Sequence, residues 1–250
     1  MYVFAFIPPP RKPKTSYRRG FSGFTLAEVL TTLLVIGVVA SITIPILVKS
    51  HEEKVTVTKL KKAYSIFDEA TKLSNLDNGI WKITTNSGSV VGGSGLIYNY
   101  YKKYLNIAKD CGAQSQGCWG KGKTKNLNGE DYAYAGDGFL TGGCYSVIIN
   151  DGMYVTFDAS NNRQNQLGYD CLDGDCWATI IFVDVNGDKG PNTFARDIFI
   201  FVRTNDGILN PAGFKKSETL CKKNAQGKYP GTFAGGSCTY KVLSTGKIDY

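Results

Sequence analysis

The pattern of apolar and polar residues divides the chain into a membrane-length apolar segment and a longer mixed remainder. Residues 29–48 contain no charged side chain, and one carboxylate, Glu28, directly precedes them. As an α-helix these residues extend about 30 Å, which matches the hydrocarbon thickness of a bilayer. The pattern therefore predicts a single transmembrane helix near the N-terminus.

Helical periodicity continues beyond the apolar segment. Between His51 and Leu76 the chain becomes polar, but apolar residues still recur at spacings of three and four. Asn78 and Gly79 follow, and both tolerate the left-handed backbone that ends many helices. We expect residues 49–77 to form a soluble, amphipathic half of the helix that packs on a globular head, residues 78–250. Its apolar stripe consists of Leu60, Ala63, Tyr64, Phe67, Ala70 and Leu73.

The later part of the chain has strand patterns. Residues 144–149 and 153–158 flank a short turn, and residues 177–185 and 197–203 are rich in Ile, Val and Phe. Residues 96–108 are expected to form a short helix. Hairpin-length connections favour an antiparallel sheet of about four strands. The predicted fold class is α+β, with a long N-terminal helix packed on this sheet.

Most of the net positive charge lies in the first 23 residues. Five of the 29 Lys and Arg residues lie in residues 1–23, which contain no acid, leaving 24 basic and 21 acidic residues elsewhere. The positive-inside rule then places the N-terminus in the cytoplasm and the head outside it. The small surplus on the remainder gives no reason to expect a nucleic-acid partner.

The hexapeptide before the apolar segment reads Gly23-Phe24-Thr25-Leu26-Ala27-Glu28. It resembles the N-terminal motif of type IV prepilins and type II secretion pseudopilins, in which a basic leader ends in Gly. The resemblance implies that residues 1–23 are a leader. It also implies that prepilin peptidase cuts between Gly23 and Phe24 and that Phe24 is then methylated. Glu28 becomes the fifth residue of the mature chain.

The same resemblance implies a filament. Residues 24–48 would be the transmembrane half of the helix, with Gly37 and Pro45 at positions where the family places helix kinks. A carboxylate entering a bilayer needs a partner. Glu28 could pair with the new amine of Phe24 on a neighbouring copy, which would set the stagger of a head-to-tail assembly.

The implied partners are further copies of the chain, related pilins, membrane lipid, prepilin peptidase, and an assembly platform with its ATPase. The implied location is the bacterial inner membrane, in a single pass with a cytoplasmic N-terminus, and later a periplasmic or extracellular filament. The implied function is a structural subunit of a type II secretion pseudopilus or type IV pilus. The motif does not separate these two, nor a major from a minor subunit.

Seven cysteines in an exported head indicate disulfides. Proximity along the chain suggests Cys111 with Cys118 and Cys171 with Cys176. Cys221 and Cys238 enclose a C-terminal loop of the kind that type IV pilins commonly close. Cys144 would remain unpaired. Zinc is the competing interpretation, but the chain has no C-x-x-C motif and only one histidine, His51.

A polar loop between the last two predicted strands is a candidate calcium site. Oxygen side chains at alternate positions can converge on a hard cation. The opening resembles an EF-hand-type loop, but its Gly falls one place late and Ala195 stands where the bidentate Glu is expected. Major pseudopilins have calcium in a similarly placed loop, whereas the alternative is a hydrophilic hairpin turn without metal. The candidate ligands are Asp184, Asn186, Asp188, Asn192 and Asp197.

Candidate catalytic groups are sparse. The single histidine lies in the helix, so the head lacks one for a Ser-His or Cys-His arrangement, and no phosphate-binding or nucleophile-elbow motif occurs. We therefore expect no enzymatic activity. The alternative to a filament subunit is a membrane-anchored periplasmic binding or enzymatic domain that never polymerises.

Overall fold

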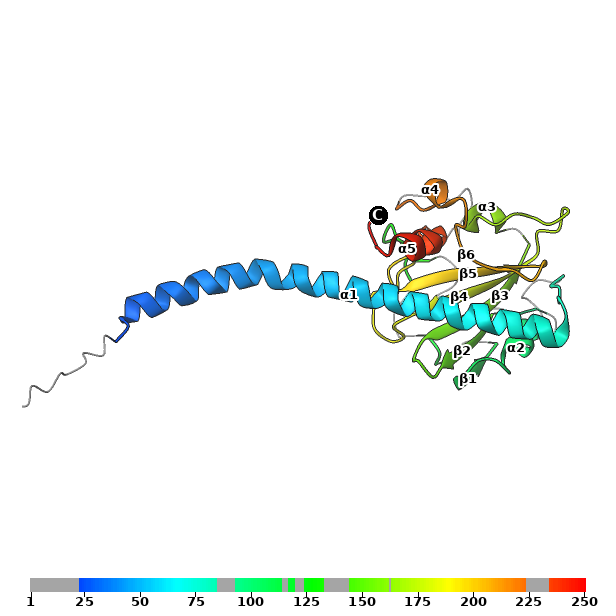
Figure 1. Ribbon diagram of the computed structural model, residues 1–250, viewed down its shortest axis with the longest axis horizontal. Coiled ribbons are helices and arrows are strands. Elements are labelled where there is room, and N and C mark those ends of the chain that lie inside the picture. Colours follow the sequence, from blue (N-terminus) through cyan, green and yellow to red (C-terminus); the bar gives the residue numbers. More distant parts are fainter. Residues whose placement is uncertain are drawn as a thin grey trace, which may run out of the picture. The chain divides into compact units, whose positions relative to one another are not determined.

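The protein is described by a computed structural model (Figure 1). Its chain divides into two compact units, residues 1–47 and 48–250, and helix α1, Leu26–Asn78, contributes to both. Residues 1–22 of the predicted leader lie outside the described part. The structure describes residues 23–84, 93–113, 117–119, 124–132, 144–161, 163–223 and 234–250.

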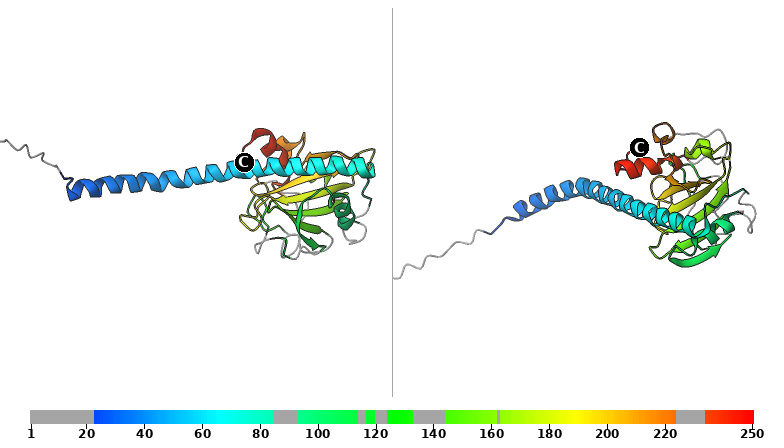
Figure 2. Two further views of the ribbon diagram at one scale, coloured as in Figure 1. Left: turned by 60° about the horizontal axis from the view of Figure 1, so that its bottom comes forward. Right: turned by 45° about the vertical axis from the view of Figure 1, so that its right-hand side comes forward.

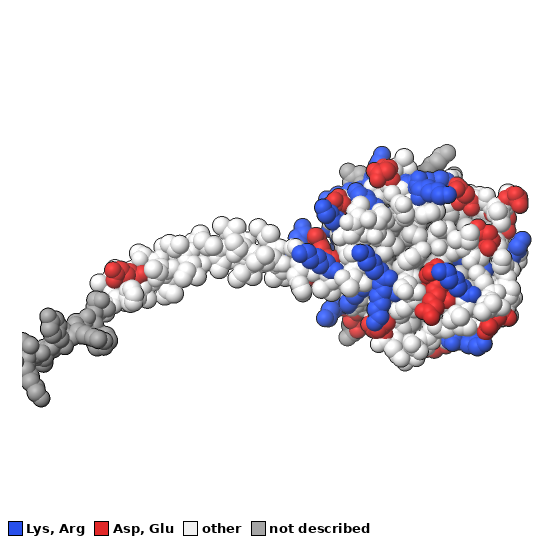
Figure 3. Space-filling view, in the orientation of Figure 1, with Lys and Arg blue, Asp and Glu red and all other residues white. Residues whose placement is uncertain are grey.

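The N-terminal unit contains the apolar half of α1. The helix begins at Leu26 and continues without interruption through Gly37 and Pro45. Its large apolar side chains are exposed on every side, and one stretch is long and apolar enough to cross a membrane. Figure 3 shows an uncharged surface along this part of the helix, with acidic atoms only near its beginning. The predicted N-terminal membrane-length helix is therefore confirmed.

The second unit is built around a six-stranded antiparallel sheet in which sequence neighbours are also spatial neighbours. The expected number of about four strands is wrong, whereas the antiparallel arrangement and the α+β class are confirmed. The strands are β1 (Ile107–Gly112), β2 (Tyr145–Ile149), β3 (Tyr154–Ser160), β4 (Ala178–Asp184), β5 (Ile198–Thr204) and β6 (Leu209–Pro211).

The two additional strands lie at the edges of the sheet, where the sequence pattern is weakest. Strand β1 contains Lys109 and Asp110 and is interrupted by register shifts against β2. Strand β6 has three residues and ends in Pro211. Charges, irregular register and proline are common protections of edge strands, and they also remove the apolar alternation that identifies a strand.

One face of the sheet packs against the soluble half of α1. The α1 side chains Leu60, Ala63 and Phe67 are fully buried there, against Phe157 and Phe201 of the sheet. Figures 1 and 2 show this half of α1 lying over one face of the sheet, with α2, Ser94–Tyr101, beside it. The predicted apolar stripe is correct except at Leu73, which is 40% exposed, because the buried face continues through Thr71 and Ser74.

The opposite face of the sheet is covered by short helices and loops. Ile180 and Phe182 of β4 and Ile200 of β5 pack there with Leu167 and Phe194. Because β4 and β5 are buried on both faces, their apolar residues form nearly continuous runs. The short helices are α3 (Gln164–Leu167), α4 (Ser217–Leu220), the 3-10 helix η1 (Gly236–Cys238) and α5 (Thr239–Thr245). Of these, α5 packs through Val242 with the core cluster on the α1 side of the sheet.

The helix expected over residues 96–108 is shorter than predicted. Helix α2 ends at Tyr101, and residues 107–112 pair with β2 instead. The buried ring of Tyr101 packs against Phe67 and Phe157, with ring centroids 6.3 and 5.5 Å apart. Tertiary packing of the tyrosines thus fixes α2, while the polar residues after it complete the sheet edge.

Candidate functional site

The predicted cleavage site lies directly before the start of α1. Gly23 and Phe24 are exposed and non-helical, and Phe24 is 87% exposed. The peptide bond between them is therefore accessible, outside the helical hydrogen-bond ladder. An enzyme that cuts a peptide bond needs such an accessible backbone.

Thr25 and Glu28 form a reciprocal cap at the beginning of α1. The Glu28 carboxylate accepts hydrogen bonds from the Thr25 backbone N–H at 2.8 Å and from its hydroxyl at 2.9 Å. The Glu28 N–H donates to the Thr25 hydroxyl oxygen at 3.2 Å. This is a capping box, which satisfies backbone donors that a helix start leaves free. The Thr-x-x-Glu signature of this cap is visible in the sequence.

The candidate calcium loop, residues 185–197, connects the ends of two buried strands. Asp184 ends β4 and Asp197 immediately precedes β5, and both are almost completely buried. The backbone N–H of Val185 donates to the Asp197 carbonyl oxygen at 3.0 Å, which closes the base of the loop. The sheet thereby brings together two carboxylates that are thirteen positions apart in the sequence.

Each of the two carboxylates is partly satisfied by backbone donors. One Asp184 oxygen accepts from the N–H groups of Asn186 and Gly187, both at 3.0 Å. The Asp197 oxygens accept from the N–H groups of Asn192 and Thr193 at 2.7 and 2.6 Å. These bonds hold both side chains facing the loop interior.

Burial makes the charged forms of this pair unfavourable. Desolvation, followed by the nearby Asp197 charge, raises the pKa of Asp184 to about 8. Desolvation also raises the pKa of Asp197, although its backbone donors oppose the shift. A buried pair of like charges needs either a proton or a cation.

Three loop oxygens lack the partner that buried polar atoms normally have. Oδ2 of Asp184, Oδ1 of Asn186 and Oδ1 of Asn192 are buried without a hydrogen-bond partner among the described residues. All three are hard oxygen acceptors, the ligand type that Ca²⁺ prefers. The residues present therefore fit a hard cation, and three of the five predicted ligands supply the unsatisfied atoms.

Asp188, another of the five predicted ligands, is placed differently. Asp188 is exposed, and its carboxylate interacts with the phenol of Tyr154. Burial, together with that carboxylate, raises the pKa of Tyr154 to about 12. Among the described residues no group of three or more His, Cys, Asp and Glu side chains is placed to hold a metal. Any cation here would depend on amide oxygens as well as on carboxylates.

The C-terminus braces the same loop. The Tyr250 hydroxyl donates to the carbonyl oxygen of Ala195, and the Arg196 guanidinium lies 5.5 Å from the centre of the Tyr250 ring. Ala195 and Tyr250 also pack with Cys221 and Cys238 in a small apolar cluster. Tyr250 and the Cys221–Cys238 disulfide therefore both pack against the 185–197 loop.

The cysteines pair as their spacing suggested. Disulfides join Cys111 to Cys118, Cys171 to Cys176 and Cys221 to Cys238, and Cys144 is free and half-buried. His51 is exposed on α1.

Comparison with known proteins gives no relative. The chain matches no family model, no curated protein and no solved structure.

Proposed function

We propose that this chain is a filament subunit of the type II secretion pseudopilus or type IV pilus kind. The proposal rests on the exposed apolar surface of the N-terminal half of α1. A helix whose uncharged apolar side chains are exposed on every side follows directly on the motif Gly23–Glu28. Such a surface needs a non-aqueous environment all around it.

Two environments meet that need in succession. Lipid surrounds the helix after insertion, and the apolar helices of other copies surround it after assembly. Transfer between them leaves the apolar surface buried throughout, so the hydrophobic term opposes extraction only weakly. Prepilin peptidase would first cut after Gly23, and Phe24 would be methylated.

We assign Glu28 to assembly because no other ionisable side chain lies near it in the apolar segment. It is the only ionisable side chain between residues 24 and 48. Cleavage would create an amine on Phe24, and the Glu28 carboxylate of a neighbouring copy would pair with it. The capping box uses one Glu28 oxygen, Oε2, so the other oxygen is available for the amine of the neighbouring copy.

We propose, in addition, that the 185–197 loop binds calcium. Asp184 and Asp197 would supply charge, and Asn186 and Asn192 would supply neutral oxygens. A bound cation would neutralise the buried pair and cross-link the two strand ends. A calcium-stabilised loop favours the pseudopilus over the pilus among the two filament types.

The first experiment determines the N-terminus and intact mass of the full-length protein from its native membrane. A chain that begins at Phe24 with one added methyl group supports the proposal. A chain that begins at Met1, or one cut beyond residue 48, contradicts it and favours the anchored-domain alternative.

A second experiment separates assembly from helix capping. Glu28→Ala removes both the cap and the intermolecular carboxylate, whereas Thr25→Ala weakens the cap by about 1 kcal/mol and retains the carboxylate. We expect filament incorporation to collapse in the first variant only, with membrane insertion unchanged in both. Equal effects of the two variants would mean that Glu28 acts through the cap alone.

A further inference from the structure

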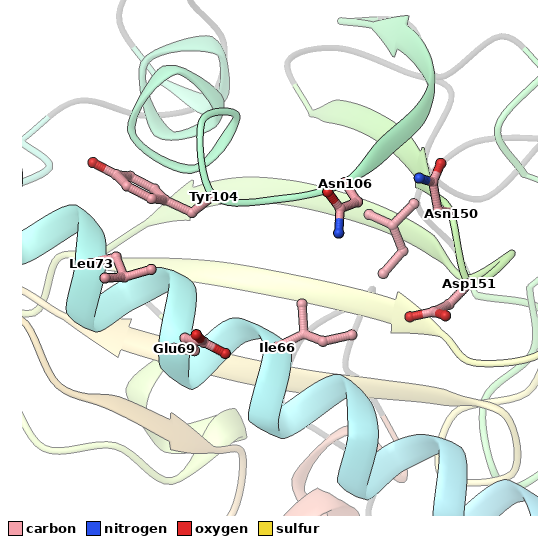
Figure 4. A pocket seen from close by; sticks show the side chains of 8 residues that line it. Ile66, Glu69, Leu73, Tyr104, Asn106, Asn150 and Asp151 are labelled. Carbon is pink, nitrogen blue, oxygen red and sulfur yellow. The ribbon is translucent and has the colours of Figure 1, made fainter.

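A groove runs between the soluble half of α1 and the connections at one edge of the sheet. It encloses about 280 Å³. Figure 4 shows that α1 forms one wall, while the chain before β1 and the β2–β3 turn form the other. All of its lining residues are described and belong to the second unit, residues 48–250: Ile66, Glu69, Leu73, Tyr104, Asn106, Ile149, Asn150 and Asp151.

The groove combines an apolar floor with acidic walls. Ile66, Leu73 and Ile149 provide the apolar atoms, and the carboxylates of Glu69 and Asp151 face the space between the walls (Figure 4). This is the complement of a lysine side chain, which has an apolar stem and a charged end.

One lysine already occupies the rim of the groove. The Lys62 ammonium lies 2.7 Å from an Asp151 oxygen, with both side chains partly exposed. Glu69 lies seven residues, or about two helical turns, further along α1. Glu69 is exposed and forms no ion pair with any described residue. The groove thus has one carboxylate, that of Glu69, that no described residue neutralises.

The complementary charge lies on the outward face of the same helix. Lys54 and Lys61 are seven residues apart, so they share one face of α1. Both are exposed, as are Thr58 and Ser65 on that face, and neither lysine forms an ion pair with a described residue. Residues 49–62 of α1 contain five Lys and two Glu, whereas residues 63–78 contain three acids and one Lys. The helix is therefore charge-segregated along its length.

We propose that Lys61 of a second copy inserts into this groove and pairs with Glu69. The contact deepens the proposed filament function and rests on it, because it joins two different surfaces and so propagates head to tail. Glu69 follows Lys61 by eight residues, which corresponds to about 12 Å of helix. Parallel copies displaced by about 12 Å therefore bring the two side chains to the same height.

Zero-length carbodiimide cross-linking of the full-length protein in native membranes and filaments tests the contact. The reagent joins a carboxylate and an amine only where they touch. We expect an intermolecular Lys61–Glu69 junction in the wild type, identified by peptide mass spectrometry, and its loss in Glu69→Gln. Glu218→Gln on α4 is the matched control, since Glu218 is exposed outside the groove. That control should retain the junction.

Charge exchange gives the second readout. Glu69→Lys should lower filament yield by up to about fivefold, given the strength of exposed ion pairs, and Lys61→Glu should do the same. The double variant Lys61→Glu/Glu69→Lys should restore the yield, while Glu218→Lys should leave it unchanged.

The outcomes distinguish the two proposals. Wild-type filaments with no Lys61–Glu69 junction, or a double variant that fails to recover, would overturn the groove contact and leave the filament function intact. A wild-type chain that is neither cut at Phe24 nor assembled would overturn the filament function itself. Loss of membrane retention in Lys61→Glu, with filament yield unchanged, would instead assign the lysine to anionic lipid and also overturn the contact.

Discussion

At the residue scale, the main finding is that the 185–197 loop and the end of β4 contain three buried side-chain oxygens without a hydrogen-bond partner among the described residues. Sequence spacing proposed the ligands but could not separate a metal loop from a hydrophilic turn, because both use the same residue types. Burial instead distinguishes the candidate ligands from one another, because Asp184, at the end of β4, is completely buried. Asp188, equally acidic in the sequence, is exposed.

Calcium should therefore raise the melting temperature of the full-length protein. Calcium at one hundred times its dissociation constant contributes about 3 kcal/mol, or a shift of about 5 °C or more for a head of this size. Scanning calorimetry in detergent, with and without chelator, measures it. Asp184→Asn should remove most of the shift, and Asp206→Asn, in the β5–β6 turn, should retain it. An unchanged wild-type melting temperature and unchanged protease sensitivity of the loop would exclude the site.

Without metal, stability should fall as the pH rises from about 4 to about 8. The folded Asp184 retains a proton that the unfolded chain releases near its ordinary pKa, because burial raises the folded pKa to about 8. The stabilising proton is fully present below the unfolded pKa and lost as the pH passes the folded one. The free energy of unfolding should decrease by at most about 1.4 kcal/mol per pH unit for this proton.

Urea unfolding in the presence of chelator at several pH values measures this slope. Asp184→Asn should flatten it, since an amide has no proton to release. Saturating calcium should also flatten it, because the cation replaces the proton. A slope of the opposite sign in the wild type would contradict the burial of this carboxyl.

At the scale of elements, two features of α1 were visible in the sequence, its apolar stripe and its N-terminal cap. Its apolar stripe was predictable because Leu60, Ala63, Phe67 and Ala70 follow helical spacing. The capping box was equally visible, and it lies wholly on the mature side of the proposed cut. Cleavage after Gly23 would therefore leave the helix start intact.

Phe67 is the α1 residue on which packing against the sheet depends most. Its ring is fully buried and lies 6.0 Å from the ring of Phe201 and 6.4 Å from that of Phe157. Phe67→Ala should reduce the free energy of unfolding by about 3–5 kcal/mol, since it removes buried surface and leaves a cavity. Chemical denaturation measures it. Leu76→Ala, at a position 79% exposed, is the matched control and should change stability little.

The edges of the sheet were beyond sequence reasoning. Strand β1 pairs through backbone groups that any residue supplies, while its side chains at Lys109 and Asp110 are exposed. Pairing of this kind depends on the neighbouring strand and leaves no apolar period in the sequence. The groove was equally unpredictable from local sequence, because its walls come from α1 and two connections that are distant in the chain.

At the scale of the whole molecule, the chain consists of one unit that requires an apolar environment and one that has its own core. The first α1 side chain buried in the head is Val57. We expect a chain starting at residue 49 to fold as a soluble protein with a cooperative thermal transition. Its melting temperature should lie within a few degrees of that of the full-length protein in detergent. Aggregation of this fragment would mean that the head needs the apolar half of α1 to fold.

The contacts of Tyr250 couple this residue to the 185–197 loop. Its hydroxyl is bound to the Ala195 carbonyl, its ring is packed beside Arg196, and the Cys221–Cys238 bond closes the segment that precedes it. The Tyr250 side chain therefore moves with the loop, and a spectroscopic probe at residue 250 would report any rearrangement of residues 185–197.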